Sequence, residues 1–335
     1  MKLATALATT AALIAPVAQA ETFRVADVLP PEHHVSQSLT QWFMAEVTAR
    51  TDGAIEFQHF PSSQLGKPQD VPALVKNGIA DIGFVVPTFV PETLPMTDVA
   101  ALPGNYGTAC QGSAALWQLV DEGVLAQDEL APAGLKAIMV YVNAPYEIFT
   151  ADAPVTSVAD LEGLKIRTAG GALDMTARAL GAVSVRMSTP EIYESLSRGT
   201  IDGLFFGFDS FQTYGFDELA THATLGGNFG TVFATYLMKQ ETWDALSEEH
   251  KTVFRAVADE AMTRTCASVD DNRAATIAQL EEAGITFSEF SGDDLATLSD
   301  TLAEVNVQWA DALEARGMPG EKVLADFRAA ADAAQ

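Results

Sequence analysis

LVKNGIADIGFVV, residues 74–86, and LSRGTIDGLFF, residues 196–206, are two copies of one pattern, in which a helical stretch stops at a glycine and a strand follows. The two stops are Gly78 and Gly199. Around the first copy, residues 22–86 alternate between strand and helix patterns in the order strand, helix, strand, helix, strand. This order is typical of a mostly parallel sheet. The repeated pattern therefore predicts two α/β units of similar build.

The period of the apolar residues predicts the other elements. The predicted strands are 22–29, 54–60, 81–86, 135–143, 165–169 and 182–187, and the predicted helices are 34–50, 171–180 and 247–282. The last of these helices is free of glycine and proline until Gly284 ends it. A capping box, Ser188 with Glu191 three residues later, begins a further helix. Extended segments near Asn143 and at 231–237 join the two units, which predicts a hinge with a cleft beside it.

Length and charge limit the partners of this protein. A chain of 335 residues suits two domains. Its formal net charge of -26 repels nucleic acid and anionic lipid, so neither is an expected partner. The same field repels small anions, so an acidic ligand requires a local cation.

The first twenty residues have the composition of a secretory signal peptide. Lys2 precedes an apolar run from Leu3 to Val17, and AQA at 18–20 is a small-x-small cleavage pattern. We therefore predict a cleaved signal peptide at 1–20 and a periplasmic mature protein. A retained N-terminal anchor is the minority alternative.

The chain has two cysteines, Cys110 and Cys266. An oxidising compartment permits a disulfide between them, which the loop-entropy argument values at roughly 4–5 kcal/mol. Two buried free thiols are an equally weighted alternative.

An arginine stands beside two glycines in LEGLKIRTAGG, residues 161–171. Arg167 ends a predicted strand, and Gly170 and Gly171 open the next helix, whose first amides are expected to be unpaired and partially positive. An arginine fork beside a helix N-terminus suits a carboxylate or a sulfonate. The alternative is an ion pair between Arg167 and a surface carboxylate.

The stretch LFFGFDSF, residues 204–211, crowds four phenylalanines around Gly207 and Asp209. The carboxyl end of a strand in a parallel sheet faces the ligand crevice, so some of these rings are expected to wall a pocket while at least two fill the core. Asp209 either accepts a proton from a ligand or caps the following helix. Elsewhere, HExxH, GxSxG and CxxC are absent, and the adjacent His33 and His34 have no third ligand at helical spacing. No metal, cofactor or catalytic residue is predicted.

Seven stretches together resemble the solute receptors of tripartite ATP-independent periplasmic (TRAP) transporters, in order along almost the whole mature chain. They are TFRVADVLPPEHHVS at 22–36, FPSSQLG at 60–66, GIADIGFVVP at 78–87, LPMTDVAALPG at 94–104, LEGLKIRTAGG at 161–171, STPEIYESLSRGTIDG at 188–203 and MKQETWDALS at 238–247. The resemblance implies an α/β, two-domain periplasmic binding protein fold with hinge strands, a central cleft and a long spine helix. We place the signal peptide at 1–20, domain I at 21–143 plus 231–267, and domain II at 144–230 plus 268–335, with the C-terminal helices in domain II.

The resemblance also implies that Arg167 receives the acid group of a small organic anion, and that the large and small membrane subunits of a TRAP transporter are the partners. It implies no enzyme activity. A periplasmic lyase or hydrolase with His33 or Asp209 as base is the alternative, and a ligand-dependent partner of a membrane sensor is a third possibility. The sequence leaves the identity of the acid and the oligomeric state open.

At two positions this sequence differs from relatives in ways that limit the class of ligand. Phe206 stands where sialate and dicarboxylate receptors carry asparagine, and Tyr146 and Glu147 stand where some relatives carry a second arginine. A monocarboxylate or sulfonate is therefore expected. Arg186 is expected to be solvent-facing or ion-paired, and a second anion contact is the lesser alternative. The expected ligand-binding residues are Arg167, Phe206, Phe208, Asp209, Tyr146, His33, Gln64, Pro87, Phe89, Thr231 and Phe233.

Overall fold

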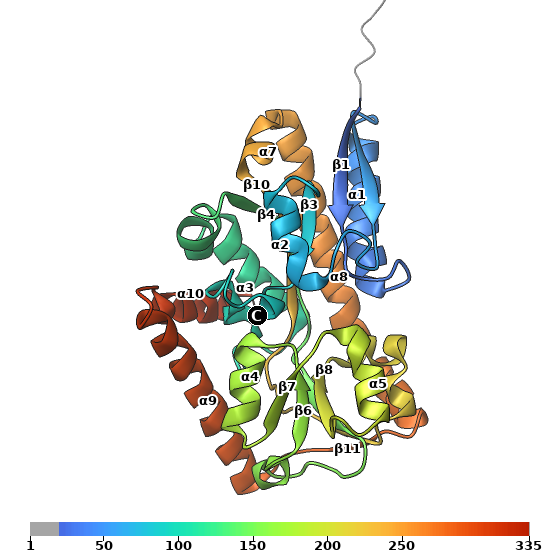
Figure 1. Ribbon diagram of the computed structural model, residues 1–335, viewed down its shortest axis with the longest axis vertical. Coiled ribbons are helices and arrows are strands. Elements are labelled where there is room, and N and C mark those ends of the chain that lie inside the picture. Colours follow the sequence, from blue (N-terminus) through green and yellow to red (C-terminus); the bar gives the residue numbers. More distant parts are fainter. Residues whose placement is uncertain (1–19, 335) are drawn as a thin grey trace, which may run out of the picture.

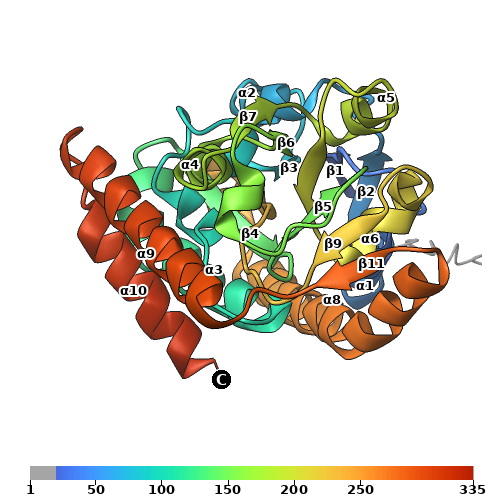
Figure 2. The same cartoon turned by 90° about the horizontal axis from the view of Figure 1, so that it is seen from below.

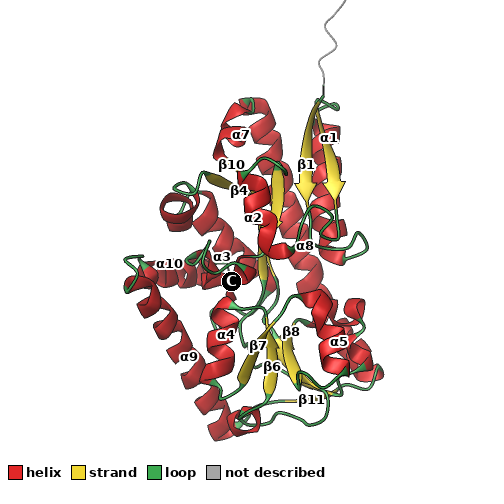
Figure 3. Ribbon diagram, in the orientation of Figure 1, coloured by secondary structure: helices red, strands yellow, loops and turns green. Residues whose placement is uncertain are grey.

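The structure is a computed structural model that describes residues 20–334, and it consists of two α/β domains, each built on one sheet (Figure 1). This architecture confirms the predicted fold class. The signal peptide predicted for 1–20 lies outside the described residues except for Ala20. Helices flank the strands in both domains (Figure 3).

Domain I contains a five-stranded sheet in the order β2-β1-β3-β10-β4. Its strands are β1 (Glu21–Ala26), β2 (Ile55–Phe60), β3 (Ile82–Val85), β4 (Leu135–Val142) and β10 (Phe233–Lys239), and its helices include α1 (Trp42–Arg50), α2 (Val71–Lys76), α3 (Ala109–Asp121) and α7 (Gln240–Ala245). Strand β1 pairs in parallel with β2 and β3, as the repeated pattern predicts. Strand β10 is antiparallel to both of its neighbours, β3 and β4, because the chain returns to this sheet from domain II.

Domain II contains a six-stranded sheet in the order β11-β9-β5-β8-β6-β7. Its strands are β5 (Glu147–Thr150), β6 (Lys165–Thr168), β7 (Val183–Arg186), β8 (Gly203–Phe206), β9 (His222–Thr224) and β11 (Thr286–Ser288), and its short helices are α4 (Gly171–Ala179), α5 (Ile192–Ser197) and α6 (Phe208–Phe211). Successive residues of β8 point to opposite faces of the sheet, so Phe205 belongs to one apolar cluster and Phe206 to another. Arg167 of β6 pairs with Leu204 and therefore shares the face of Phe206.

Two hinge segments and one long helix connect the domains, and the C-terminal helices cross between them once more. The two predicted hinge segments lie side by side, since the Tyr146 amide donates to the Gly230 carbonyl at 2.8 Å and the Phe229 amide donates to the Tyr146 carbonyl at 3.1 Å. The third connection is α8 (Glu248–Glu282), a helix of 35 residues that confirms the predicted spine. The Ser247 hydroxyl caps its first turn by accepting from the His250 amide at 3.1 Å. Buried side chains of α8 belong to the core of domain I up to Val269 and to that of domain II at Leu280.

The C-terminal helices differ from the expected division. Helix α9 (Gly292–Glu314) lies against α4, but α10 (Gly320–Ala333) folds back onto α3 of domain I, as Figure 2 shows at one edge of the molecule. Phe327 of α10 is fully buried in the domain I core, and its ring is 6.0 Å from that of Tyr106. The assignment of 268–335 as a whole to domain II is therefore wrong for α10 and for the second half of α9, because their buried side chains belong to the core of domain I.

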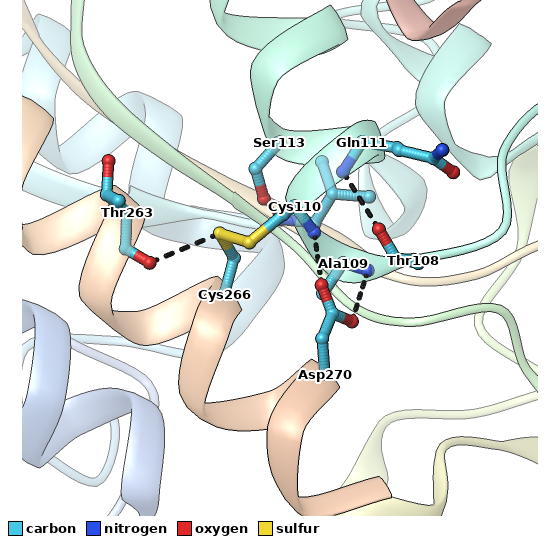
Figure 4. The surroundings of a disulfide bond; sticks show 9 residues. Thr108, Ala109, Cys110, Gln111, Ser113, Thr263, Cys266 and Asp270 are labelled. Carbon is cyan, nitrogen blue, oxygen red and sulfur yellow. Dashed lines mark hydrogen bonds between the residues drawn. A yellow bond between two sulfur atoms is a disulfide. The ribbon is translucent and has the colours of Figure 1, made fainter. Parts of the chain in front are cut away.

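A disulfide joins Cys110 of α3 to Cys266 of α8, with Cα atoms 4.8 Å apart (Figure 4). The sequence left open whether the two cysteines form a disulfide or stay free thiols, and the structure shows the disulfide. Beside it, Asp270 of α8 accepts hydrogen bonds from the Ala109 and Cys110 amides at 2.8 and 3.0 Å and so caps the N-terminus of α3. Two contacts therefore fix α3 to the spine helix.

Within residues 20–334, no helix combines the length and the apolar composition that a bilayer crossing requires.

Candidate ligand-binding cleft

A cavity of about 80 Å³ lies between the domains where the hinge strands cross. Side chains of both domains line it, and most of them are apolar. They are Val28, Leu29, His33, Val35, Phe84, Val86, Phe89, Tyr141, Asn143, Val232, Phe233 and Ala234 from domain I and the hinge, and Tyr146, Arg167, Thr189, Phe206, Ser210 and Tyr214 from domain II. A mostly apolar lining with a few polar groups is typical of a site for a small organic molecule.

Arg167 forms the cationic part of this cavity. Its side chain is 1% exposed, and its Nε and Nη2 atoms both donate to the Met187 carbonyl, at 3.1 and 3.0 Å. Its Nη1 atom has no hydrogen-bond partner within the described chain. Burial lowers the pKa of Arg167 to about 10, which leaves the guanidinium protonated at neutral pH. The structure therefore holds a positive charge in the cleft with one donor group free.

The helix N-terminus beside Arg167 is already occupied. The Ala172 amide in the first turn of α4 donates to Oδ2 of Asp98, a buried residue of domain I, at 2.7 Å. Gly171 has φ +54°, and a Cβ at this position would stand 2.3 Å from the Asp98 carboxylate, so the backbone approaches Asp98 as only glycine permits. Burial raises the pKa of Asp98 to about 7. The expectation that this terminus offers free amides to a ligand is wrong, because a carboxylate of the other domain takes that place.

Aromatic rings surround the guanidinium. The Arg167 Cζ atom lies 6.0 Å from the centre of the Phe206 ring, which stacks on Tyr146 at 5.7 Å and meets Tyr214 edge-on at 6.0 Å. Phe208, the other ring expected at the ligand, does not line the cavity. It begins α6 after the turn at Gly207, and its ring packs against Phe149 and Phe287 with Arg273 above it.

The wall from domain I includes two of the four residues expected there. His33 and Phe89 line the cavity, whereas Pro87, which begins the turn before Phe89, and Gln64 do not. Gln64 is exposed in the loop after β2. Burial and the neighbouring His34 lower the pKa of His33 to about 4, so its ring is neutral at pH 7. Because its Nδ1 atom accepts from the Val35 amide at 3.2 Å, the ring proton belongs on Nε2.

Asp209 and Thr231 do not line the cavity either. The Oδ2 atom of Asp209 contacts Nε2 of His34, across the cleft, at 2.8 Å. Burial alone would raise the pKa of Asp209, but the hydrogen bond and charge of His34 outweigh it and lower that pKa. The Thr231 hydroxyl donates to the Ala144 carbonyl at 3.2 Å, between the two hinge segments. Phe233, its expected companion, does line the cavity.

A groove of about 660 Å³ lies beside the cavity, and Phe89 lines both. Two exposed cations, Lys67 and Arg186, and one carboxylate, Glu191, border this groove. Arg186 is solvent-facing, as predicted, and its Nη2 atom also donates across the groove to the Phe89 carbonyl at 2.7 Å. The groove is thus a locally positive surface beside the cavity on a strongly negative protein.

Several lining residues were not anticipated from the sequence. Tyr141 lies in an apolar strand that reads as plain core, and Asn143 was noted only as part of the hinge. Ser210 lies within the stretch 204–211 but had no predicted role, and Tyr214 lies three residues beyond that stretch. Their closeness to Asp209 in the sequence was the one feature that could have indicated a place in the cavity.

The fold and the cleft define a two-domain solute-binding protein. Residues 25–311 match the family described as bacterial extracellular solute-binding protein, family 7, and the chain belongs to this family of TRAP solute-binding proteins. A marine metagenome TRAP solute-binding protein specific for aromatic acid ligands, solved with metahydroxyphenylacetate, is 25% identical with a TM-score of 0.85, and the match covers 94% of this chain and 99% of that one.

A TRAP periplasmic solute-binding protein from Bordetella bronchiseptica, solved with (R)- and (S)-mandelate, is 27% identical with a TM-score of 0.84, covering 94% of this chain and all, 100%, of that one. The outer membrane transporter protein TsaT of Comamonas testosteroni is 26% identical over 332 residues, 97% of each chain. The family and the solved relatives are transport proteins rather than enzymes, so the lyase or hydrolase alternative is set aside. Proteins of this family bind small organic ligands and work with transporter subunits in the membrane.

Proposed function

We propose that this protein is the periplasmic receptor of a TRAP transporter for a small aromatic monoacid, a carboxylate or a sulfonate, which Arg167 binds inside the cleft. The observation that carries the proposal is the free Nη1 donor of a buried guanidinium in a cavity walled by aromatic rings. A buried cation without an anion is unfavourable, and a bidentate acid group relieves it. The solved relatives with metahydroxyphenylacetate and mandelate support the same ligand class.

The charge of the lining favours one acid group over two. Among the lining residues, all within 20–334, Arg167 is the sole arginine or lysine, and His33 is neutral at pH 7. The aromatic side chains Phe206, Phe84 and Phe233 favour a flat apolar body on the ligand. A second carboxylate would lose its hydration here without gaining a cation.

The proposed mechanism is closure of the cleft on the ligand. Domains I and II both contribute lining side chains, so the ligand touches both only in the closed form and shifts the population toward it. Moving the balance from mostly open to mostly closed takes about 5 kcal/mol of preference for the closed form. We also propose that residues 1–20 direct export and are removed.

Thermal unfolding of the purified protein with benzoate, mandelate, benzenesulfonate and succinate tests the proposal. A ligand bound by the native state alone raises the melting temperature, and at a hundred times its dissociation constant it adds about 2.7 kcal/mol of stability. We expect a rise with at least one aromatic monoacid and none with succinate. A rise with succinate alone, or with none of the aromatic acids, contradicts the proposal, and comparing benzoate with benzenesulfonate distinguishes the two acid groups.

A further inference from the structure

The cavity holds a second polar group without a partner. The Tyr141 hydroxyl is buried, and within the described residues it makes no hydrogen bond. The other buried tyrosines do bond through their hydroxyls. Tyr236 pairs with the Thr40 hydroxyl at 2.6 Å, and Tyr106 donates to the Ala100 carbonyl at 3.0 Å. An unmade hydrogen bond in a ligand cavity indicates that the ligand supplies the partner.

The two free groups belong to different domains. Tyr141 comes from β4 of domain I, where it pairs with Ala234, another lining residue, and the Arg167 Nη1 atom comes from β6 of domain II. A ligand that satisfies both therefore has two polar ends and bridges the cleft. The rings of Phe84, Phe206 and Phe233 also line this cavity, so the body that joins the ends is apolar.

The surroundings of Tyr141 decide the charge of the second polar end. Burial raises the pKa of Tyr141 well above its ordinary value, so the group remains a neutral hydroxyl that both donates and accepts. The charge of Asp209 acts on Tyr141 in the same direction. A carboxylate at this end would meet a negative field without a cation, whereas a hydroxyl on the ligand meets a matching hydroxyl.

We infer that Tyr141 is a specificity-determining residue, which hydrogen-bonds a hydroxyl on the aromatic ring of the ligand while Arg167 binds the acid group. The ligand class is therefore a ring-hydroxylated aromatic monoacid. This inference rests on the proposed function, since it assumes that Arg167 holds an aromatic acid.

Calorimetric titration of the wild-type protein and of Tyr141→Phe tests it. Whichever of benzoate and benzenesulfonate binds the wild type more tightly is compared with its three ring-hydroxylated isomers. We expect at least one isomer to bind the wild type about tenfold more tightly than the parent acid, the worth of one good neutral hydrogen bond. In Tyr141→Phe, this preference should disappear while the affinity for the parent acid stays within about twofold.

Tyr236→Phe is the matched control, because it removes a buried hydroxyl from the neighbouring strand of the same sheet and does not touch the cavity. It should leave the preference unchanged. The inference is overturned if Tyr141→Phe keeps the preference, or if it weakens the parent acid and its isomers equally. A wild-type protein that binds neither parent acid nor any isomer overturns the proposed function itself, so the two failures are distinct.

Discussion

Replacing Arg167 by methionine separates ligand binding from folding. Methionine keeps much of the apolar length of the arginine side chain but removes the charge and the free Nη1 donor. The bound acid group is then buried without a partner, which costs roughly 3–5 kcal/mol, and we expect affinity to fall by two to three orders of magnitude or slightly more. Arg167→Lys should recover little, because one ammonium cannot both bond the Met187 carbonyl and present a fork to the ligand.

The unliganded protein should respond quite differently to the same change. Burial lowers the pKa of Arg167 from 12.5 to about 10, which corresponds to about 3 kcal/mol of unfavourable free energy in the empty cleft. Removing the charge relieves this cost, while the orphaned Met187 carbonyl costs roughly 1–3 kcal/mol. The stability of Arg167→Met without ligand should therefore stay within about 2 kcal/mol of the wild type.

Calorimetric titration with the acid found by the thermal screen checks the predicted loss of affinity. Urea unfolding without ligand checks the predicted stability. The reasoning is refuted if Arg167→Met binds that acid with wild-type affinity. It is also refuted if the variant loses as much folding stability as binding energy, since Arg167 would then be a structural residue.

Three further predictions concern contacts that hold the fold and the closed cleft together. Replacing Cys110 and Cys266 by serine opens a loop spanning 156 positions, which should lower the free energy of unfolding by about 5 kcal/mol and leave ligand affinity unchanged. Urea unfolding that matches the wild type contradicts this. Asp98 has a native pKa of about 7, above its ordinary 3.8, so its contribution to stability is complete below about pH 4 and is lost as the pH rises through 7, by up to roughly 4 kcal/mol. Asp98→Asn should flatten the dependence of unfolding free energy on pH across this window, and an unchanged slope would show that Asp98 does not titrate there. Asp209→Asn weakens the hydrogen-bonded contact with His34 that spans the cleft and should weaken every ligand by about fivefold, which corresponds to roughly 1 kcal/mol. A loss of affinity confined to one ligand argues against a role in closure.

The sequence predicted the elements whose information is local. The capping box at Ser188, with hydrogen bonds from its amide and hydroxyl to Glu191 at 3.0 and 2.5 Å, and the spine helix from Glu248 were both found where periodicity and capping residues placed them. The repeated glycine stops correctly indicated two α/β units. These features depend on neighbours along the chain, which is why one sequence was enough.

The errors concern contacts between distant segments. The amide of Ala172 was expected to be free because nothing nearby in sequence competes for it, yet Asp98 reaches it across the cleft. Phe208 follows Phe206 by two residues and would share its face in a strand, but the strand ends at Phe206 and the turn redirects the next ring. Tyr141 was not predicted to line the cavity, because a tyrosine within an apolar strand gives no sign that its hydroxyl lacks a partner.

The position of β10 has a consequence for biosynthesis. This strand, Phe233–Lys239, occupies the gap between β3 and β4, which end at Val85 and Val142. A nascent chain that has not yet produced residue 233 cannot finish its first sheet, however long it waits at the ribosome. Pairings between such distant segments form slowly, because a long loop must close before any contact rewards it. The order of the strands thus delays folding until most of the polypeptide has been made, and an unfolded polypeptide is the form that a translocation channel can thread.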